Sequence, residues 1–581
     1  MALLVRNGTV FDGTGRPRQE VDILIEDGRV VRLEPDIEAT ADCQVIEADS
    51  CWVTPGFIDL HTHYDAELEI APGLTESVRH GVTTVLIGSC GLSMVAGEPE
   101  DMADMFCRVE GIPRDTVLPV LEDVVDWSGP AGYVEHLSGL QLGPNLVAMA
   151  GHSTIRAEAM GFERSVTEKL GPTEPEFARM EALTEEAIEA GMLGLSANLL
   201  PWDKLGGTRF RSRPTPSVFA TFGEYRRLAE VVRRRRAVFQ AIPNLQTRWS
   251  IPALMDLSRP RDGVPLRTSL LSLMDAPPAM GAHKLVARAA DAMNRRMGAE
   301  LKFQSLPTPF DLYTDGLENP VFEELGAGTA ALHIEDLAER RSLMASPEYR
   351  KRFRRQWTNK LAPRAYHRDL DEARIVSCPD HTLDGMTFAH IARERGEHPV
   401  ETFLDLQAEF GNDLRWYSVV ANGDPDELRW IVEHPAALIG FSDAGAHLRN
   451  MAFYNFGLRM LKRTADDLAS GRGTMSVERS VHRLTAEIAD FLKIDAGRLE
   501  VGSRADLVVI DPAHLDADVE RIEEAEMAGF NGLRRLVRRN DKAVRSVVIK
   551  GCEAWSDGAP APGFGVKSGW GEFLPIKADL N

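Results

Sequence analysis

Two histidines separated by one residue follow an apolar segment near the start of the chain. Residues 55–63 read PGFIDLHTH, so His61 and His63 stand where a short buried strand would end. Side chains at positions i and i+2 of a strand point the same way, so both imidazoles can reach one cation. An isolated His-x-His triplet is weak evidence, but this position strengthens it. We therefore predict that His61 and His63 bind a metal ion.

A cysteine follows the next apolar run. Residues 82–91 read VTTVLIGSCG, which predicts a strand whose exit loop contains Cys90. A single cysteine is more often an inert core residue than a ligand. One strand away from the paired histidines, however, a thiolate has high affinity for zinc. Cys90 is therefore a third candidate ligand.

An aspartate closes the last apolar run of this kind, residues 436–443, which read AALIGFSD. In a closed barrel of eight strands the eighth lies beside the first, so Asp443 would face the two histidines across the metal. A carboxylate there can ligate the metal, take a proton from bound water and pass it to a leaving nitrogen. The alternative is a carboxylate that only caps a turn. We expect Asp443 to be a metal ligand and the catalytic residue.

Two further histidines lie near predicted strand ends. His152 interrupts an apolar run and could polarise a scissile carbonyl or bind the metal. His447 follows the aspartate by four residues and could orient either the substrate or that aspartate. For both, a hydrogen-bonded structural role is an equal alternative. We place them as candidate substrate-binding residues.

These residues fall at the ends of short apolar runs that alternate with helical stretches. Such alternation predicts parallel βα units, and eight of them predict a (β/α)₈ barrel with its reactive residues at the carboxyl ends of the strands. The eight predicted strands cover residues 57–61, 82–88, 145–152, 194–200, 237–244, 266–275, 301–307 and 436–443.

The two ends of the chain share a different sequence pattern, in which short apolar runs are separated by turn signals such as Asn-Gly and Asp-Gly. This predicts one small β-sandwich formed from both termini, so the expected class is α/β, a distorted TIM-like barrel beside that sandwich. Two long intervals within the barrel would be insertions that cover the mouth of the active site. The expected division is 1–56 and 485–581 for the sandwich, 57–484 for the barrel, and 91–140 and 308–435 for the insertions.

Composition limits the class of protein. With 66 basic and 88 acidic residues the net charge is −22, which argues against nucleic acid as a partner. No apolar run is long enough to cross a bilayer, and the first residues do not form an export signal, so we expect a cytoplasmic protein without membrane contact. The six cysteines show no paired spacing, which favours reduced thiols.

Taken together, the motifs resemble those of the N-acyl-D-amino-acid deacylases in the metal-dependent amidohydrolase superfamily. The resemblance runs in order over nearly the whole chain, in residues 56–63, 81–91, 151–161, 194–196, 442–443 and 497–507. It implies a split β-sandwich, a distorted barrel and one or two zinc ions that activate water against an amide. It also implies that His61, His63 and Asp443 hold the more exposed metal, while Cys90 joins two further histidines on a tighter one.

The sequence departs from that family at those two histidines. The fifth predicted strand contains Gln240 and the sixth ends in Met274-Asp275, so neither supplies a histidine. The simplest arrangement is one zinc ion held by His61, His63 and Asp443, with Cys90 as fourth ligand or neighbour and water in the open position. A second zinc ion is left open, and Gln240 becomes a candidate substrate-binding residue.

The family's lysine beside the sixth-strand histidines, a natural partner for a substrate carboxylate, is also missing. Arg211 and Arg213 could replace its charge, because guanidinium groups match carboxylates. The alternative is that both lie in a solvated loop.

The resulting hypothesis is hydrolysis of a C–N amide bond in a small N-acylated amino-acid-like molecule, by water activated on a metal, with an aspartate as proton shuttle. One alternative is a cyclic amide or imide hydrolase that uses the same centre. Another is a non-catalytic descendant that binds a ligand in the barrel mouth. A homo-oligomer is possible by analogy.

Overall fold

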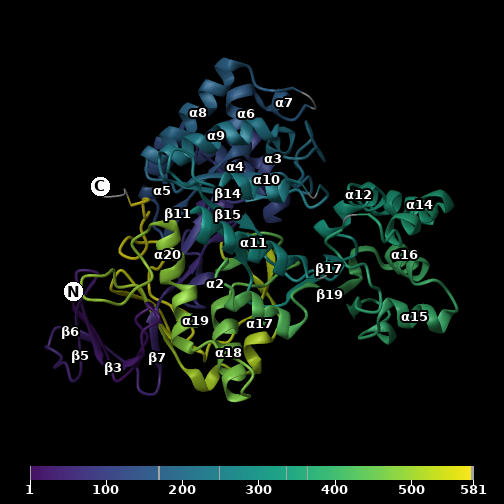
Figure 1. Ribbon diagram of the computed structural model, residues 1–581. Coiled ribbons are helices and arrows are strands. Elements are labelled where there is room, and N and C mark those ends of the chain that lie inside the picture. Colours follow the sequence, from purple (N-terminus) through teal and green to yellow (C-terminus); the bar gives the residue numbers. More distant parts are fainter. Residues whose placement is uncertain are drawn as a thin grey trace.

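The computed structural model is an α/β protein in which helices surround parallel strands (Figure 1). It describes residues 2–167, 170–247, 249–279, 281–334, 336–362 and 364–577. No helix in these residues is long and apolar enough to span a membrane. All six cysteines are free thiols, as the sequence predicted.

The central strands are parallel and almost entirely buried, which is why their sequences are continuous apolar runs rather than alternating ones. In pairing order they follow one another from the first to the last and return to the first. Their bounds are β8 (Phe57–Asp59) continued by β9 (His61–Thr62), β10 (Val82–Ile87), β11 (Asn145–Ala148) continued by β12 (Ala150–Gly151), β13 (Gly194–Asn198), β14 (Val238–Ile242), β15 (Arg267–Leu271), β16 (Glu300–Ser305), and β20 (Ala437–Ile439) continued by β21 (Phe441–Ala444).

Each of the eight predicted strands is present, with one change at the third. The strand ends at Gly151, and His152 is the first residue of helix α6 (His152–Met160). The last strand pairs with the first in parallel, with Phe441 opposite His61. Because these strands are parallel, their carboxyl ends all lie at the same edge.

Helices connect these strands. Several begin with the capping residues that their sequences supply: Thr173 and Glu176 form a capping box, and the Thr221 hydroxyl accepts from the Glu224 N–H. The connecting helices are α1 (Asp65–Ile70), α2 (Thr75–Val78), α7 (Phe162–Ser165), α8 (Glu174–Glu189), α9 (Phe222–Arg234), α10 (Ser250–Leu257), α11 (Ala282–Met297), α17 (Pro425–Glu433), α18 (Phe456–Ala469), α19 (Val477–Leu484) and α20 (Ala486–Leu492).

Strands from both chain ends meet in one seven-stranded sheet. In it Val53 of β7 (Trp52–Pro55) lies opposite Val509 of β22 (Leu507–Ile510). Its other strands are β2 (Thr9–Val10), β3 (Gln19–Glu20), β25 (Val544–Ile549), β26 (Cys552–Ser556) and β27 (Ala559–Pro560). A second sheet contains β1 (Ala2–Arg6), β4 (Asp22–Glu26), β5 (Arg29–Glu34) and β6 (Cys43–Glu47). Apolar side chains from both ends of the chain share one buried cluster between them.

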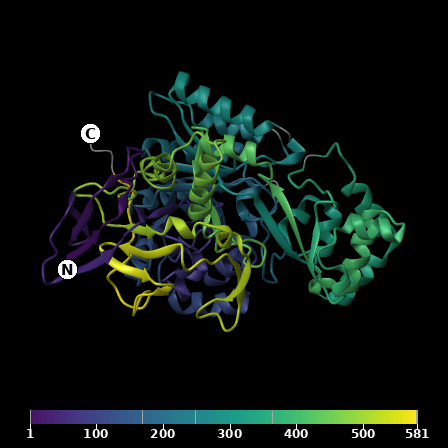
Figure 2. The ribbon, with the colours of Figure 1, turned by 90° about the horizontal axis from the view of Figure 1, so that it is seen from below.

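The two long intervals form structures of their own. The first contains α3 (Pro99–Glu110), α4 (Arg114–Val124) and α5 (Pro130–Gly139). The second, between β16 and β20, carries a three-stranded antiparallel sheet and projects to one side in both views, as a lobe (Figures 1 and 2). Its elements are β17 (Phe310–Asp315), α12 (Gly326–Leu332), α13 (Leu337–Ala345), α14 (Pro347–Trp357), β18 (Arg374–Ser377), α15 (Phe388–Arg395), α16 (Pro399–Phe410) and β19 (Arg415–Ala421).

Aromatic packing holds this lobe together. Phe403 contacts the rings of Phe322, Trp357 and Trp416 with centroids 5.5–6.1 Å apart. Near the end of the chain, β23 (Glu523–Glu526) and β24 (Arg534–Val537) form a separate hairpin.

Candidate metal centre

Four side chains from three neighbouring strands converge at the carboxyl ends of the strands. His61 Nε2 lies 3.1 Å and His63 Nε2 lies 3.3 Å from Cys90 Sγ. Asp443 Oδ1 lies 3.3 Å from His63 Nε2 and 3.7 Å from His61 Nε2. His61, His63 and Cys90 are the group of three buried residues whose ligand atoms all lie within 4.8 Å of one another.

These separations fit a zinc ion. Zinc bonds of about 2.0–2.3 Å in a tetrahedron place neighbouring ligand atoms about 3.3–3.6 Å apart. The separations of 3.1–3.7 Å between the nitrogen, sulfur and oxygen atoms bracket this range. Two imidazoles, a thiolate and a carboxylate are also the ligand types that zinc prefers. His61, His63 and Cys90 can therefore hold one zinc ion, and Asp443 lies within 3.7 Å of both imidazoles as a further candidate ligand.

The direction of side chains along the first strand explains how both histidines reach the candidate metal position. Between them, Thr62 turns away and its hydroxyl donates to the Leu86 carbonyl. The Ser442 hydroxyl donates to the carboxylate of Asp59, which ties the ends of the first and last strands together. His61 and His63 thus lie on the same side of their strand, as the i, i+2 spacing predicted.

Cys90 and Asp443 both adopt a backbone conformation that is rare outside glycine. Their φ angles are +57° and +59°, in the left-handed region, where a non-glycine residue costs on the order of 1 kcal/mol or more. The Cys90 turn is held by strand side chains: the Cys90 N–H donates to Gln240 Oε1 at 3.3 Å and the Gly91 N–H donates to Ser196 Oγ at 3.0 Å. Side chains of β13 and β14 therefore hold the turn that carries the Cys90 thiol.

A buried amide fixes the His61 ring. His61 Nδ1–H donates to Gln304 Oε1 at 2.6 Å, and Gln304 Nε2 donates to Ser269 Oγ at 3.0 Å. This arrangement places the proton on Nδ1 and leaves the Nε2 lone pair facing Cys90 and Asp443. Sequence reasoning missed Gln304, although a glutamine within the buried run of β16 was the available signal.

Burial and charge set the protonation states of the group. Burial lowers the pKa of His61 to about 4, so the ring is neutral. Although burial alone would raise it, the hydrogen bond and charge of His63, together with the charge of His61, lower the pKa of Asp443 to about 2. Burial raises the pKa of the Cys90 thiol well above its usual value, so without a cation the thiol keeps its proton.

The chain is similar to several known proteins. The model of the amidohydrolase family matches residues 329–552. An uncharacterized protein of Mycobacterium tuberculosis is 46% identical over 563 residues, which cover 96% of this chain and 92% of the relative. N-acyl-D-aspartate deacylase of Alcaligenes xylosoxydans is 30% identical over 193 residues, 33% of this chain and 36% of the relative. N-acyl-D-glutamate deacylase of Bordetella bronchiseptica, solved with zinc and a phosphonate inhibitor, has a TM-score of 0.63 at 21% identity, with 99% of each chain covered.

The chain belongs to one family with the Mycobacterium tuberculosis protein, and its residues 329–552 match the amidohydrolase family. It is therefore a hydrolase of carbon–nitrogen bonds other than peptide bonds. Its α/β fold matches the solved deacylases.

Two of the predicted substrate-binding residues, His152 and His447, differ in their contacts with the four candidate ligands. His152 is fully buried, with Nδ1 3.0 Å from the Ser217 hydroxyl and Nε2 3.1 Å from the Glu224 carboxylate, and it contacts no candidate ligand. His447 lies close enough to Asp443 and His63 to feel their charges, and burial lowers its pKa to about 4. The structure therefore brings His447 to the mouth and gives His152 structural partners.

The two predicted arginines lie in the loop after β13. The Arg213 guanidinium donates to the Val166 carbonyl at 3.0 Å and lies over the Phe210 ring, and Arg211 is exposed. The Arg213 contacts therefore lie away from the four candidate ligands.

Two other charged residues at the mouth were missed by sequence reasoning, because no motif marks them. Asp203, also in the loop after β13, accepts a hydrogen bond from the Asn198 side chain at 2.5 Å. Arg108, at the end of α3, donates to His333 Nδ1 of the lobe at 3.2 Å and has no carboxylate within 4.0 Å among the described residues. The charge of Arg108 also lowers the pKa of His447, which places it near the mouth.

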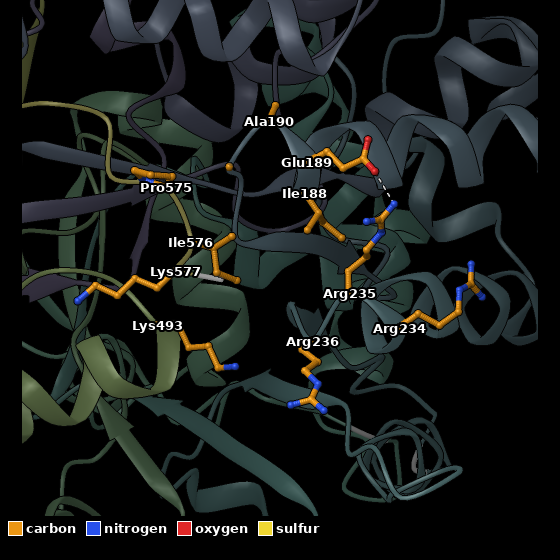
Figure 3. Close-up of a pocket in the computed structure, with 11 residues that line it drawn as sticks. Ile188, Glu189, Ala190, Arg234, Arg235, Arg236, Lys493, Pro575, Ile576 and Lys577 are labelled. Atoms are coloured by element: carbon orange, nitrogen blue, oxygen red, sulfur yellow. Dashed lines mark hydrogen bonds and ion pairs between the residues drawn. The ribbon is translucent and has the colours of Figure 1, made fainter. Parts of the chain in front are cut away.

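A separate cavity lies away from these residues. It has a volume of about 630 Å³ and is lined by basic side chains, including Arg235, Arg236 and Lys493, around the segment 188–191 (Figure 3). These segments precede β13 and β14, whereas the four candidate ligands lie at the carboxyl ends of the strands. This cavity is therefore separate from the metal centre.

The hydrogen bond to His61 predicts an effect on metal affinity. Gln304→Leu keeps the volume but leaves a buried N–H of His61 without an acceptor, so zinc affinity should fall by about 10–100-fold. Gln304→Glu keeps an acceptor and should restore most of it. Competitive zinc titration measures both, with Gln407→Leu, a buried glutamine of the lobe, as matched control. Unchanged affinity in Gln304→Leu would contradict the assigned role.

The raised pKa of Cys90 predicts a pH dependence. Below that pKa, zinc must displace the thiol proton in order to bind. The contribution of Cys90 should therefore raise the affinity of the site for zinc by about tenfold per pH unit. Cys90→Ala removes that proton, so the slope of log affinity against pH should fall by about one. Zinc titrations at several pH values measure the difference. An identical slope in parent and variant would exclude Cys90 as a ligand.

Proposed function

We propose that this amidohydrolase uses one zinc ion to hydrolyse the amide bond of a small N-acylated amino-acid-like molecule. The observation that carries the proposal is the convergence of His61, His63, Cys90 and Asp443 at separations that suit zinc. The relatives named as D-aminoacylase and as deacylases of N-acyl-D-aspartate and N-acyl-D-glutamate support the substrate class.

The scaffold in this proposal is a distorted TIM-like barrel of residues 57–484 with a split β-sandwich from residues 1–56 and 485–581. The closed order of parallel strand pairs supports the barrel. The sheet in which β7 pairs with β22 supports the split sandwich. The intervals 91–140 and 308–435 are insertions that cover the mouth of the active site. The hydrogen bond from Arg108 to His333 joins the two intervals and supports this placement.

A single zinc ion is proposed because the second site lacks ligands. In β14 the inward position holds Gln240, which accepts from the Cys90 N–H, and β15 contains no histidine. Cys90, which the resemblance assigns to the tighter metal, instead lies within reach of His61 and His63. It therefore serves as the fourth ligand or a close neighbour of the single ion.

The residues divide the chemistry among them. When bound, zinc supplies Lewis acidity to the substrate carbonyl and to the attacking water. The second oxygen of Asp443 accepts the proton of that water, and the hydrogen bond to Gln304 holds the orientation of the His61 ring. After the water oxygen attacks the carbonyl carbon, Asp443 passes that proton to the departing nitrogen as the C–N bond breaks, which leaves a carboxylic acid and an amine.

A substrate carboxylate requires a cation at the mouth, and Arg108 fits that need better than the exposed loop arginines. The residue after it, Val109, accepts from the His447 N–H at 3.0 Å, and the Arg108 guanidinium donates to His333 Nδ1 rather than to a carboxylate. A charge of this kind can form a bidentate pair with a carboxylate. His447 and Gln240 stay candidates for contacts with the rest of the substrate.

Metal content tests the proposal first. We expect about one zinc ion per chain by mass spectrometry. In Asp443→Asn, N-acylated amino acids should be hydrolysed at least about a hundredfold more slowly, because the proton acceptor is lost. Undiminished turnover in this variant would exclude the shuttle, and two zinc ions per chain would exclude the single-metal centre. A parallel panel of cyclic amides and imides separates ring opening from deacylation.

Arg108→Gln tests the carboxylate partner. For an N-acetylated amino acid KM should rise by about tenfold or more, since a charge-assisted pair is lost. For the corresponding neutral carboxamide KM should hardly change. Arg213→Gln serves as control, because its guanidinium binds a backbone carbonyl. Equal effects of Arg108→Gln on both substrates would show that Arg108 is only structural.

A further inference from the structure

A second cavity lies where the lobe joins the barrel, and it has a volume of about 260 Å³. The chain crosses between barrel and lobe twice, and both crossings line the cavity. Residues 307–309 lead from β16 into β17, and Pro425 begins α17 after β19. Most of the remaining lining comes from α18, which lies beside α17 (Figure 1). A molecule bound there would touch both segments that carry the lobe.

Basic side chains dominate the charge of this cavity. Five basic and three acidic residues line it, although the chain as a whole has a net charge of −22. The basic residues are Arg429, Arg459, Lys462, Arg463 and Arg472, and the acidic ones are Asp466, Asp467 and Glu520. The lining therefore has two positive charges in excess, which favours an anionic occupant.

Arg463 shares a carboxylate with another arginine. Its Nη2 donates to the Pro425 carbonyl at 2.6 Å, which is a neutral acceptor. Its Nε lies 3.8 Å from the Asp467 carboxylate, but that group already accepts two hydrogen bonds of 3.0 Å from Arg429. The positive charge of Arg463 is therefore only partly neutralised within the lining.

Arg459 is the buried cation of the cavity, with only 4% of its side chain exposed. Its Nη2 lies 2.6 Å from the carboxylate of Glu520, which is an exposed residue. Its Nε and Nη1 are buried and have no hydrogen-bond partner among the described residues. A buried N–H without an acceptor costs free energy, and the cost is greater on a charged group. An oxyanion in the cavity would supply both the acceptors and the opposite charge.

A neighbouring arginine adds to the positive potential at Arg459. Burial lowers the pKa of Arg459 and the charge of Arg538 lowers it further, against the opposing charges of Glu520 and Asp311. The Arg538 guanidinium itself binds the Asp311 carboxylate and, at 2.7 Å, the Ala452 carbonyl. An anion in the cavity would offset the repulsion between the two arginines.

We propose that this cavity binds a phosphate group and that the bound group fixes the lobe to the barrel. The excess of two positive charges matches the roughly two negative charges of a phosphate group near neutral pH. Its oxygens would accept hydrogen bonds from Arg459 and Arg463, because guanidinium groups pair well with phosphate. The cavity shares no lining residue with the metal centre, so the inference does not depend on the proposed amide hydrolysis.

Isothermal titration calorimetry at constant ionic strength tests the site. The probes are inorganic phosphate and a phosphate monoester, glycerol 3-phosphate, and the one that binds more tightly shows whether a free ion or a phosphorylated metabolite fits better. In Arg459→Gln the affinity for both should fall by about tenfold or more, because a charge-assisted contact is lost. Arg463→Gln should act in the same direction and replaces the buried variant if that variant does not fold.

Two further variants serve as controls. Arg479→Gln removes a guanidinium that binds Glu487 outside the cavity, so phosphate affinity should stay that of the parent. His61→Ala separates this site from the metal centre, since phosphate can also ligate zinc, and it should retain the binding. Phosphate binding that survives both Arg459→Gln and Arg463→Gln would overturn the inference. An absence of binding by the parent at millimolar concentrations of both probes would also overturn it.

Hydrogen exchange followed by mass spectrometry tests the effect on the lobe. At a phosphate concentration ten times Kd, amides that exchange only when the site opens should exchange about tenfold more slowly. We expect this slowing in peptides that contain residues 306–313 and 418–428 of the parent, but not of Arg459→Gln. Slowing that is absent from these peptides, or equal throughout the chain, would contradict the fixation of the lobe.

Discussion

The parallel pairing of the last strand with the first is the interaction on which the site depends. It places Phe441 opposite His61, and two residues later it delivers Asp443 to the two histidines. The residues it joins are about 380 positions apart, so no local preference brings them together. The bond between Ser442 and Asp59 stabilises this closure from beneath the metal centre.

Hydrogen bonds stabilise most of the polar centre inside a largely apolar interior, although His63 Nδ1 is buried without a partner. Gln304 and Ser269 accept the buried hydrogens that His61 and Gln304 present, and Gln240 and Ser196 hold the Cys90 turn. Unpaired polar groups at such depth would each cost about 1–3 kcal/mol. The left-handed conformations of Cys90 and Asp443 add strain, which the surrounding strands must offset.

The range of the forces involved explains which features could be predicted from the sequence and which could not. The apolar runs that form the parallel strands could be read directly, because burial on both faces leaves a continuous pattern. The His61–His63 pair could be read from the two-residue repeat of a strand. Gln304 and Arg108 could not, because their roles arise from contacts between segments more than 200 residues apart and no local pattern records such contacts. For His152, where the sequence left a site role and a structural role open, the residue begins a helix and lies 3.0 Å from the Ser217 hydroxyl.

The sheet shared by both chain ends has a consequence for how the molecule is made. During synthesis β7 leaves the ribosome with its pairing edge open, and its partner β22 follows only after about 450 further residues. At ~5–20 residues per second, that edge stays unpaired for tens of seconds, long enough for an apolar strand to find a wrong partner. The barrel strands meet a milder form of the same delay, since β9 waits for β21. The nascent chain is therefore most vulnerable to aggregation before its last segment emerges, and holding chaperones would act mainly on its amino-terminal strands.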